Sequence, residues 1–220
     1  VNPLQMSAAY ATVARGGIYI EPYSVTEIEF LDTGEIYTVT PEKRTVMSES
    51  TAFMINSILT YAVKSGNVSA GSKYGTEVAS KTGTSTIPAS TKKGCTVKGD
   101  IIGDSWQVTY TPEYSYAVWV GYDQNKGDTC LVSSVGNTVK KGIVRELTSK
   151  INSTNKTFTK PSSVVTATIE LETNPVQLAS EYTPDKLKSV EYFKSGAEPD
   201  TVSTRFSKLT APSNLKANYV

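Results

Sequence analysis

The sequence contains no histidine among its 220 residues. This absence excludes Ser-His-Asp catalysis, Cys-His catalysis and most zinc sites, because each of them needs an imidazole. Acid–base chemistry would therefore fall to lysine, glutamate, aspartate, tyrosine or serine. The chain also has only two cysteines, Cys95 and Cys130, which are too few for a disulfide framework and lack the spacing of a metal site. We expect neither a metal ion nor a cofactor.

A charge excess and long apolar runs are missing as well. The chain carries 22 Lys and Arg against 21 Asp and Glu, so its net charge gives no reason to expect binding to nucleic acid or to an anionic membrane surface. No apolar run is long enough to span a bilayer, and the first residues lack the pattern of a signal peptide. Because Val1 leads directly into a helix start, we expect the chain to be a piece of a longer protein.

Two helices are predicted in the first third of the chain. Asn2-Pro3 begins the first helix, which Gly16-Gly17 ends, and Ser48 caps a second helix that ends at Gly66. Between the two helices, the alternating residues 25–39 predict a β-hairpin. Both helices have an apolar face of the kind that packs on a core.

From residue 78 onward the apolar pattern has a period of two. It predicts three antiparallel strands at 78–85, 105–111 and 114–122, with a long polar loop at 86–104. A third helix, capped near Asn137 or Thr138, follows the strands, and five of its apolar side chains are expected to point inward: Val139, Ile143, Val144, Leu147 and Ile151. Helices before and after an antiparallel sheet indicate an α+β layered fold.

The composition changes after Ile151. Residues 152–210 mix polar, proline-containing stretches with short alternating segments. We therefore assign 1–151 to one domain and expect 152–210 to form an extended tail with short β pieces rather than a second full core.

The most informative stretch, residues 78–85, reads Val-Ala-Ser-Lys-Thr-Gly-Thr-Ser. A cation beside several hydroxyls on a strand edge suits a carboxylate, and a glycine lets a substrate approach the backbone. A solvated turn without function is the alternative interpretation of Lys-Thr-Gly alone. Because side chains alternate along a strand, two faces are expected: Lys81, Gly83 and Ser85 on one, Thr82 and Thr84 on the other.

Several segments repeat the order and spacing of a known family. They are the helix from Asn2, the Lys81–Ser85 stretch, the strand from Trp106 and the Trp119–Asp123 stretch. Together they resemble class A, bifunctional penicillin-binding proteins, and Lys81–Ser85 is similar to the third signature motif of that family. The end of the chain, 211–220, resembles the start of a fibronectin type III module.

The resemblance implies the C-terminal half of a penicillin-binding or serine β-lactamase-like transpeptidase fold, with an antiparallel sheet and flanking helices. It implies a serine D,D-transpeptidase that cross-links peptidoglycan stem peptides through an acyl-enzyme and is acylated by β-lactams. By resemblance Lys81 and Thr84 are catalytic, the Thr84 backbone N–H being an oxyanion donor. Five residues would bind substrate: Thr82, Gly83, Thr84, Ser85 and Trp106, although Trp106 could instead be a wall of the cleft.

The nucleophile motif of the family, Ser-x-x-Lys, does not occur before Lys81. Ser90-Thr91-Lys92-Lys93 matches it but lies after the third motif, so we interpret it as coincidence. Ser65-Gly66-Asn67 imitates the second motif, Ser-x-Asn, yet it falls at a helix C-terminus, where glycine and asparagine act as a stop signal. We therefore expect a companion polypeptide or an upstream segment to carry the serine.

The family works at the extracytoplasmic face of the bacterial membrane, anchored through an upstream segment, and its full proteins are also glycosyltransferases. In that location Cys95 and Cys130 could form a disulfide, the other possibility being two free thiols. Three other functions stay open. They are a β-lactam or peptidoglycan sensor of the same fold, a scaffold without activity, and a serine β-lactamase, although the tail is longer than such enzymes carry.

Overall fold

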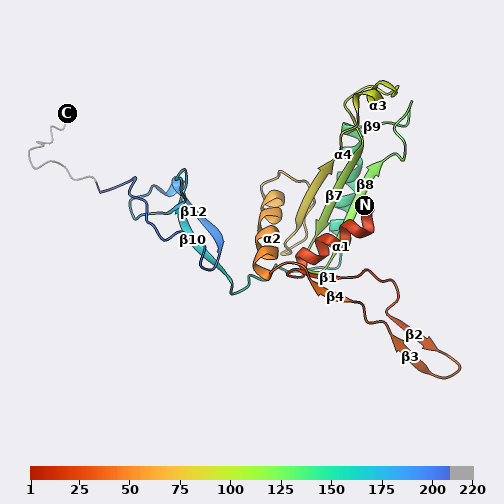
Figure 1. The fold of residues 1–220 in the computed structure, drawn as a ribbon, viewed down its shortest axis with the longest axis horizontal. Helices are drawn as coiled ribbons and strands as arrows, with labels where there is room; N and C mark the ends of the chain where they lie inside the picture. The colour runs from red at the N-terminus through yellow and green to blue at the C-terminus, as the bar shows by residue number, and fades with distance from the viewer. Residues whose placement is uncertain (209–220) are drawn as a thin grey trace, which may run out of the picture. The chain divides into compact units, whose positions relative to one another are not determined.

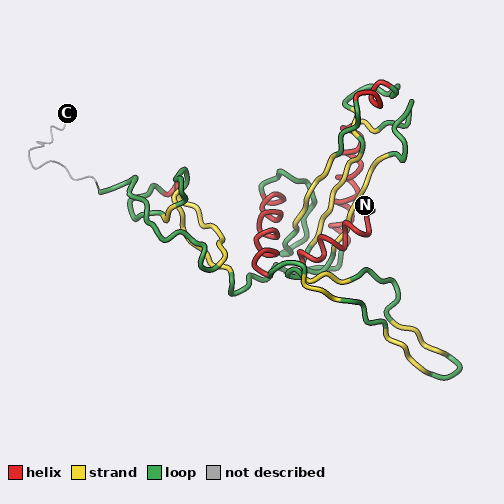
Figure 2. Tube along the Cα trace, in the orientation of Figure 1, coloured by secondary structure: helices red, strands yellow, loops and turns green. Residues whose placement is uncertain are grey.

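The computed structural model describes residues 1–208, which belong to two compact units. The first unit is Val1–Lys160, and the second begins at Pro161 (Figure 1). Figure 2 shows that the first unit combines helices and strands, while strands and loops dominate the second. The resemblance of 211–220 to a fibronectin module lies outside the described residues.

Both predicted helix starts of the first unit are confirmed. Helix α1 (Pro3–Ala14) begins with a capping box, in which the Asn2 side chain accepts from the Gln5 N–H and the Gln5 side chain accepts from the Asn2 N–H. Helix α2 (Glu49–Lys64) begins after Ser48, whose hydroxyl accepts from the Thr51 N–H.

The three predicted strands are confirmed as one antiparallel sheet. Its order is β5 (Ala79–Thr84), β7 (Asp104–Tyr110) and β8 (Ser115–Gly121). In the register, Gly83 lies opposite Trp106, and Trp106 lies opposite Trp119. Because every second residue shares a face, these three residues form one row across the sheet, and Lys81, Val108 and Ala117 form the next row.

The sheet is covered on both faces. Helix α1 passes in front of the sheet in Figure 1, and α4 (Ser133–Lys150) lies behind it. The front core joins α1 and α2 to the sheet through these buried residues: Val13, Leu59, Ala79, Tyr110 and Phe158. The back core joins α4 to the sheet through another set: Ala70, Val78, Val118 and Val144. The predicted α+β layered fold is therefore confirmed.

Smaller elements occupy the connections. Strands β2 (Glu27–Phe30) and β3 (Glu35–Thr38) form the predicted hairpin, which projects away from the sheet in Figure 1. Strand β1 (Ile18–Ile20) pairs with β4 (Lys43–Thr45). The loop 86–104 has structure of its own, because it contains α3 (Ala89–Lys93) and β6 (Ile101–Ile102), which pairs with β9 (Leu131–Val132).

The prediction for the third helix was wrong in its start and in its buried face. Helix α4 begins at Ser133 rather than near Asn137, and its buried residues are spaced by four: Gly136, Lys140, Val144 and Thr148. Only Val144 of the expected inward set is among them, while Val139, Ile143 and Leu147 are exposed. The polar stripe is the buried one because the back of the sheet is itself polar at Ser105 and Gln107.

The first compact unit ends at Lys160 rather than at the expected Ile151, because residues 152–160 pack on it. The Glu77 N–H donates to the Lys156 carbonyl at 2.7 Å, and the Phe158 N–H donates to the Glu77 carboxylate at 3.0 Å. The Phe158 ring is buried in the front core beside Tyr110. The first unit therefore continues to Lys160, because burial of the Phe158 ring holds this segment on the core.

The second unit is a compact piece rather than an extended tail. It holds a sheet of β10 (Val164–Glu170), β11 (Gln177–Leu178) and β12 (Lys188–Lys194), with β10 in the middle, and one 3-10 turn, η1 (Asp185–Leu187). Its buried Glu170 accepts a hydrogen bond from the Thr183 hydroxyl at 2.5 Å. Within residues 1–208, none of the helices has the length and hydropathy needed to cross a bilayer.

Candidate functional site

Strand β5 is an edge strand in the described part of the chain. It pairs with β7 along one side, and its other side has no neighbouring strand among residues 1–208. Lys81 and Thr84 are exposed, whereas Thr82, Gly83 and Ser85 are partly buried. The Lys81 ammonium donates a hydrogen bond to the Thr82 carbonyl at 2.5 Å. A cation and two threonine hydroxyls thus lie along an open strand edge.

A pocket of about 210 Å³ lies on the front face of this strand. Its lining includes Lys81, Thr82 and Gly83 from β5, Trp106 from β7 and Tyr10 from α1. The strand register, rather than proximity in the sequence, brings Trp106 beside the Lys-Thr-Gly strand. A positive charge beside an apolar wall suits a ligand with a carboxylate and an apolar body.

Glycine at 83 keeps the space beside Trp106 open. A Cβ built at Gly83 would lie 3.3 Å from the Trp106 Cβ, closer than side chains ordinarily pack. The residue thus allows a close approach of the tryptophan, or of a ligand, to the backbone of β5.

Asp104 connects the end of the Lys-Thr-Gly strand to a second tryptophan, and no sequence motif singled it out. The Ser85 hydroxyl donates to Asp104 Oδ2 at 2.5 Å, and the Trp119 indole N–H donates to Asp104 Oδ1 at 2.7 Å. Asp104 could have been predicted from the sequence by its spacing. It lies two residues before Trp106, and residues two apart in a strand share a face.

Buried polar groups hold β5 against β7 from behind. The Ser80 hydroxyl lies 2.8 Å from the Thr109 hydroxyl, and the Gln107 amide donates to Ser80 Oγ at 3.1 Å. Lys140 on α4 is also buried there, and burial lowers the pKa of its ammonium, as do the positive charges of Lys141 and Lys81. Buried hydrogen bonds of Ser80 with Thr109 and Gln107 thus fix the position of β5 against β7.

Two family descriptions match this chain. "Penicillin binding protein transpeptidase domain" matches residues 1–149, and "Penicillin-binding protein 1A, C-terminal domain" matches residues 160–208. The chain belongs to the penicillin-binding protein transpeptidase family. These matches agree with the class A resemblance and with a separate unit after Lys160.

Relatives with curated names agree with this family. Penicillin-binding protein 1A/1B of Bacillus subtilis strain 168 is 39% identical over 208 residues, which cover 94% of this chain and 23% of that protein. Penicillin-binding protein 1A of Clostridium botulinum strain Langeland is 28% identical over 220 residues, covering 95% of this chain and 24% of that protein. The chain thus spans about a quarter of the length of these relatives.

A solved structure shares the fold. The penicillin-binding protein PonA1 from Mycobacterium tuberculosis superposes with a TM-score of 0.52 at 23% identity, covering 71% of this chain and 40% of that one. Penicillin-binding protein A from M. tuberculosis, in a ceftriaxone acyl-enzyme complex, superposes with a TM-score of 0.50 at 20% identity, covering 69% and 33%.

Two Ser-x-x-Lys matches of this penicillin-binding protein chain lie among the described residues, and neither lies at the Lys-Thr-Gly strand. Ser90 is exposed in the first turn of the five-residue helix α3, and its hydroxyl forms no hydrogen bond within residues 1–208. Ser153, three residues before Lys156, is 2% exposed and donates to the Glu113 carboxylate at 2.8 Å. A third match, Ser213 to Lys216, lies outside the described residues.

Ser153 lies at the far end of the sheet from Thr84. Its partner Glu113 follows Tyr110, which pairs with Ala79, and Thr84 is five residues further along β5. Five strand residues span about 17 Å, so the Ser153 hydroxyl does not reach the end of β5 at Thr84.

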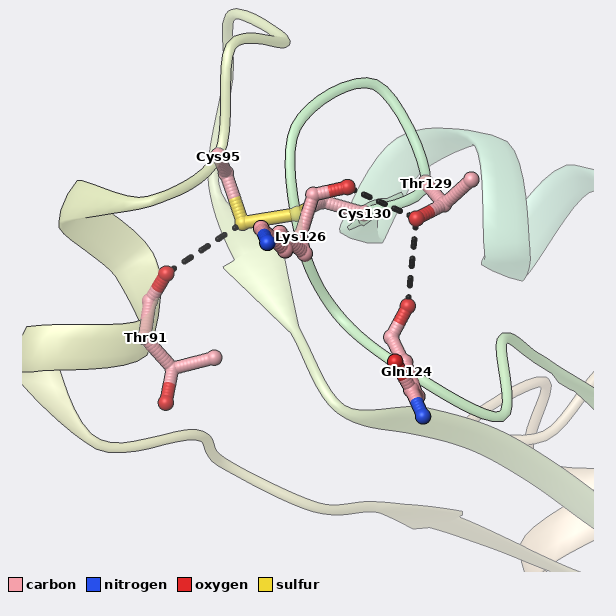
Figure 3. Close-up of a disulfide and its surroundings, with 6 residues drawn as sticks. All are labelled: Thr91, Cys95, Gln124, Lys126, Thr129 and Cys130. Atoms are coloured by element: carbon pink, nitrogen blue, oxygen red, sulfur yellow. Dashed lines mark hydrogen bonds between the residues drawn. A yellow bond between two sulfur atoms is a disulfide. The ribbon is translucent and has the colours of Figure 1, made fainter.

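The structure joins Cys95 and Cys130 in a disulfide with their Cα atoms 5.9 Å apart, so the open question of their pairing is answered. Figure 3 shows the bond between the loop after β5 and the loop after β8. Backbone hydrogen bonds accompany it, since the Thr96 N–H donates to the Gly127 carbonyl and the Gly127 N–H donates to the Gly94 carbonyl. The disulfide thereby cross-links the loop that follows β5 to the loop that follows β8.

Proposed function

We propose that this chain supplies the Lys-Thr-Gly strand of a serine D,D-transpeptidase that cross-links peptidoglycan stem peptides. A serine on an upstream segment or companion polypeptide attacks the D-Ala–D-Ala bond, releases the terminal D-alanine and passes the acyl group to an amine on another stem. The same serine is acylated by β-lactams, and penicillin-binding protein A from M. tuberculosis forms an acyl-enzyme of this kind with ceftriaxone. The full protein is also a peptidoglycan glycosyltransferase.

The observation that carries this proposal is the open edge of β5. Lys81 and Thr84 are exposed on a strand that pairs on one side within residues 1–208, and a pocket with an aromatic wall adjoins it. The Lys81 ammonium and the hydroxyls of Thr82 and Thr84 hold the terminal carboxylate of the substrate by charge and hydrogen bonding. The Thr84 backbone N–H points one donor at the developing oxyanion, a contribution of about 2.7–4 kcal/mol in other enzymes.

The disulfide supports an extracytoplasmic location. Disulfides persist outside the cytoplasm and are rare in the reducing interior of the cell. The Cys95–Cys130 bond therefore fits the outer face of the bacterial membrane, with the anchor supplied by another part of the polypeptide.

Cross-linking by the full polypeptide tests the proposal. Glycan-linked stem peptides are incubated with the purified protein, and released D-alanine and cross-linked dimers are quantified by mass spectrometry. We expect both products, and we expect pretreatment with a β-lactam to abolish both. Acylation by the β-lactam without either product would instead favour a sensor of the same fold and would contradict the transpeptidase.

A further inference from the structure

A second recess of about 460 Å³ adjoins the Lys81 pocket and has the opposite charge. It is lined by Asp104, Trp106, Trp119 and Asp123, together with the first residues of the chain. Among residues 1–208, no lysine or arginine side chain lines it. Trp106 and Val1 line both spaces, so a ligand on the Lys81 side and a ligand in the recess would both lie beside the Trp106 ring.

The floor of the recess is a built feature of the sheet. Trp106 and Trp119 lie opposite each other on β7 and β8, with ring centroids 6.3 Å apart. The Trp119 ring extends over Gly121, where an added Cβ would lie 2.5 Å from Trp119 Cζ2. Glycine at 121 therefore lets the indole reach Asp104, to which it donates at 2.7 Å.

Both carboxylates keep their negative charge available to a ligand. The donors to Asp104 are the Ser85 hydroxyl and the Trp119 N–H, which are neutral and do not cancel a charge. Asp123 is exposed and forms no hydrogen bond or ion pair within residues 1–208. The capping box of α1 already uses the Asn2 and Gln5 N–H groups, so the helix start beside the recess does not offer those donors to an anion.

We propose that this recess, defined by Asp104, Trp106, Trp119 and Asp123, binds the amine-bearing side chain of the acceptor stem peptide. Indole faces attract ammonium groups and pack against alkyl stems, and the carboxylates add charge attraction. The donor carboxylate is held on the cationic side of Trp106 and the acceptor amine on the anionic side. Because the two sides of the Trp106 ring carry opposite charges, the Lys81 side favours the donor and the recess favours the acceptor. The inference rests on the proposed transpeptidase function.

The test uses the full polypeptide, including the segment that carries the serine. A thioester analogue of the donor peptide acylates the protein, and the acyl group is then shared between water and a stem-peptide acceptor with a free primary amine. The rate of transfer to the amine is measured against acceptor concentration, and penicillin acylation is measured in parallel. The variant is Asp123→Asn, and the matched control is Asp128→Asn, an exposed aspartate of the same loop outside the lining.

We expect Asp123→Asn to raise the acceptor concentration for half-maximal transfer about threefold to fivefold, the range of one exposed ion pair. Penicillin acylation and hydrolysis should change less than twofold, and Asp128→Asn should match the wild type. Added salt should raise the half-maximal acceptor concentration of the wild type more than that of Asp123→Asn, because salt screens only an existing charge pair. Asp123→Glu should restore most of the affinity.

Three results would overturn the assignment. Equal acceptor dependence in Asp123→Asn and Asp128→Asn would show that the recess does not bind the amine. An equal loss of penicillin acylation and of transfer in Asp123→Asn would place the residue in the donor site instead. A wild-type protein that is acylated but transfers to no amine would defeat the proposed function itself and this inference with it.

Discussion

At the residue scale, the site depends on two kinds of group that respond differently to substitution. In the proposed function, Lys81 acts through its side chain, whereas Thr84 contributes a backbone N–H in addition to its hydroxyl. The exposure of both on the open edge of β5 means that their removal leaves no buried group unpaired. Changes in activity can therefore be separated from changes in folding.

Lys81→Ala should slow acylation by β-lactams more than Thr84→Ala does, because the backbone donor survives in the threonine variant. We expect Lys81→Ala to cost at least tenfold more than Thr84→Ala in the full polypeptide. Lys81→Arg should not restore the rate, since a planar guanidinium fills a different space from a compact ammonium. Second-order rates with fluorescent penicillin measure this, and equal losses in the two alanine variants would count against the assignment.

A buried tyrosine should make the fold sensitive to alkali. Burial raises the pKa of Tyr110, with a further contribution from Tyr10, and its hydroxyl donates to Asn56 at 2.9 Å. Below about pH 10 the phenol is neutral in both the folded and unfolded states, and above it only the unfolded state ionises readily. The free energy of unfolding should then fall by up to about 1.4 kcal/mol per pH unit for this one group.

Tyr110→Phe isolates that effect. The variant should be less stable at pH 8, because Asn56 loses its donor, yet its stability should decline less steeply above pH 10. Urea unfolding between pH 8 and 11 measures both quantities. The same slope in the variant and the wild type would show that Tyr110 is not the group responsible.

At the element scale, much of the fold was predictable from local sequence. The Asn2 cap, Ser48 and the period of two from residue 78 indicated the helices and strands because local hydrogen bonds and alternation determine them. The face of α4 was not predictable, because burial of Lys140 and Thr148 depends on the polar back of β7, which lies far away in sequence. The joining of Asp104 to Trp119 likewise depends on strand register.

The disulfide should stabilise the loops beside the site. Replacing Cys95 and Cys130 together by alanine opens a loop with a sequence separation of 35 and should lower the free energy of unfolding by about 2–4 kcal/mol. Reductant should destabilise the wild type by a similar amount and leave the double variant unchanged. Guanidinium unfolding with and without dithiothreitol measures this. A double variant as stable as the oxidised wild type would show that the hydrogen bonds at Gly127 suffice.

At the scale of the whole molecule, the unit boundary follows packing rather than composition. The polar sequence from 152 to 160 resembles a linker, yet Phe158 is buried beside Tyr110. A full polypeptide that ends at Lys160 should keep its fold and its acylation by penicillin. One that ends at Ile151 should lose about 3–5 kcal/mol, the usual effect of deleting a buried phenylalanine. Thermal unfolding of the two truncations measures this, and equal stability would contradict the boundary.

The family was predictable from the order of its segments, and the nucleophile was not, since the described part of the chain places neither Ser90 nor Ser153 at the Lys-Thr-Gly strand. We infer a division of roles in which this chain holds the substrate while another segment supplies the serine.

Labelling with fluorescent penicillin on a denaturing gel is the decisive test of that division of roles. The 23.7 kDa chain alone should stay dark, and the full polypeptide should carry the label on a serine upstream of residue 1. A label on the 23.7 kDa chain itself, at Ser90 or any other serine, would show that the nucleophile lies on this chain and would contradict the proposal.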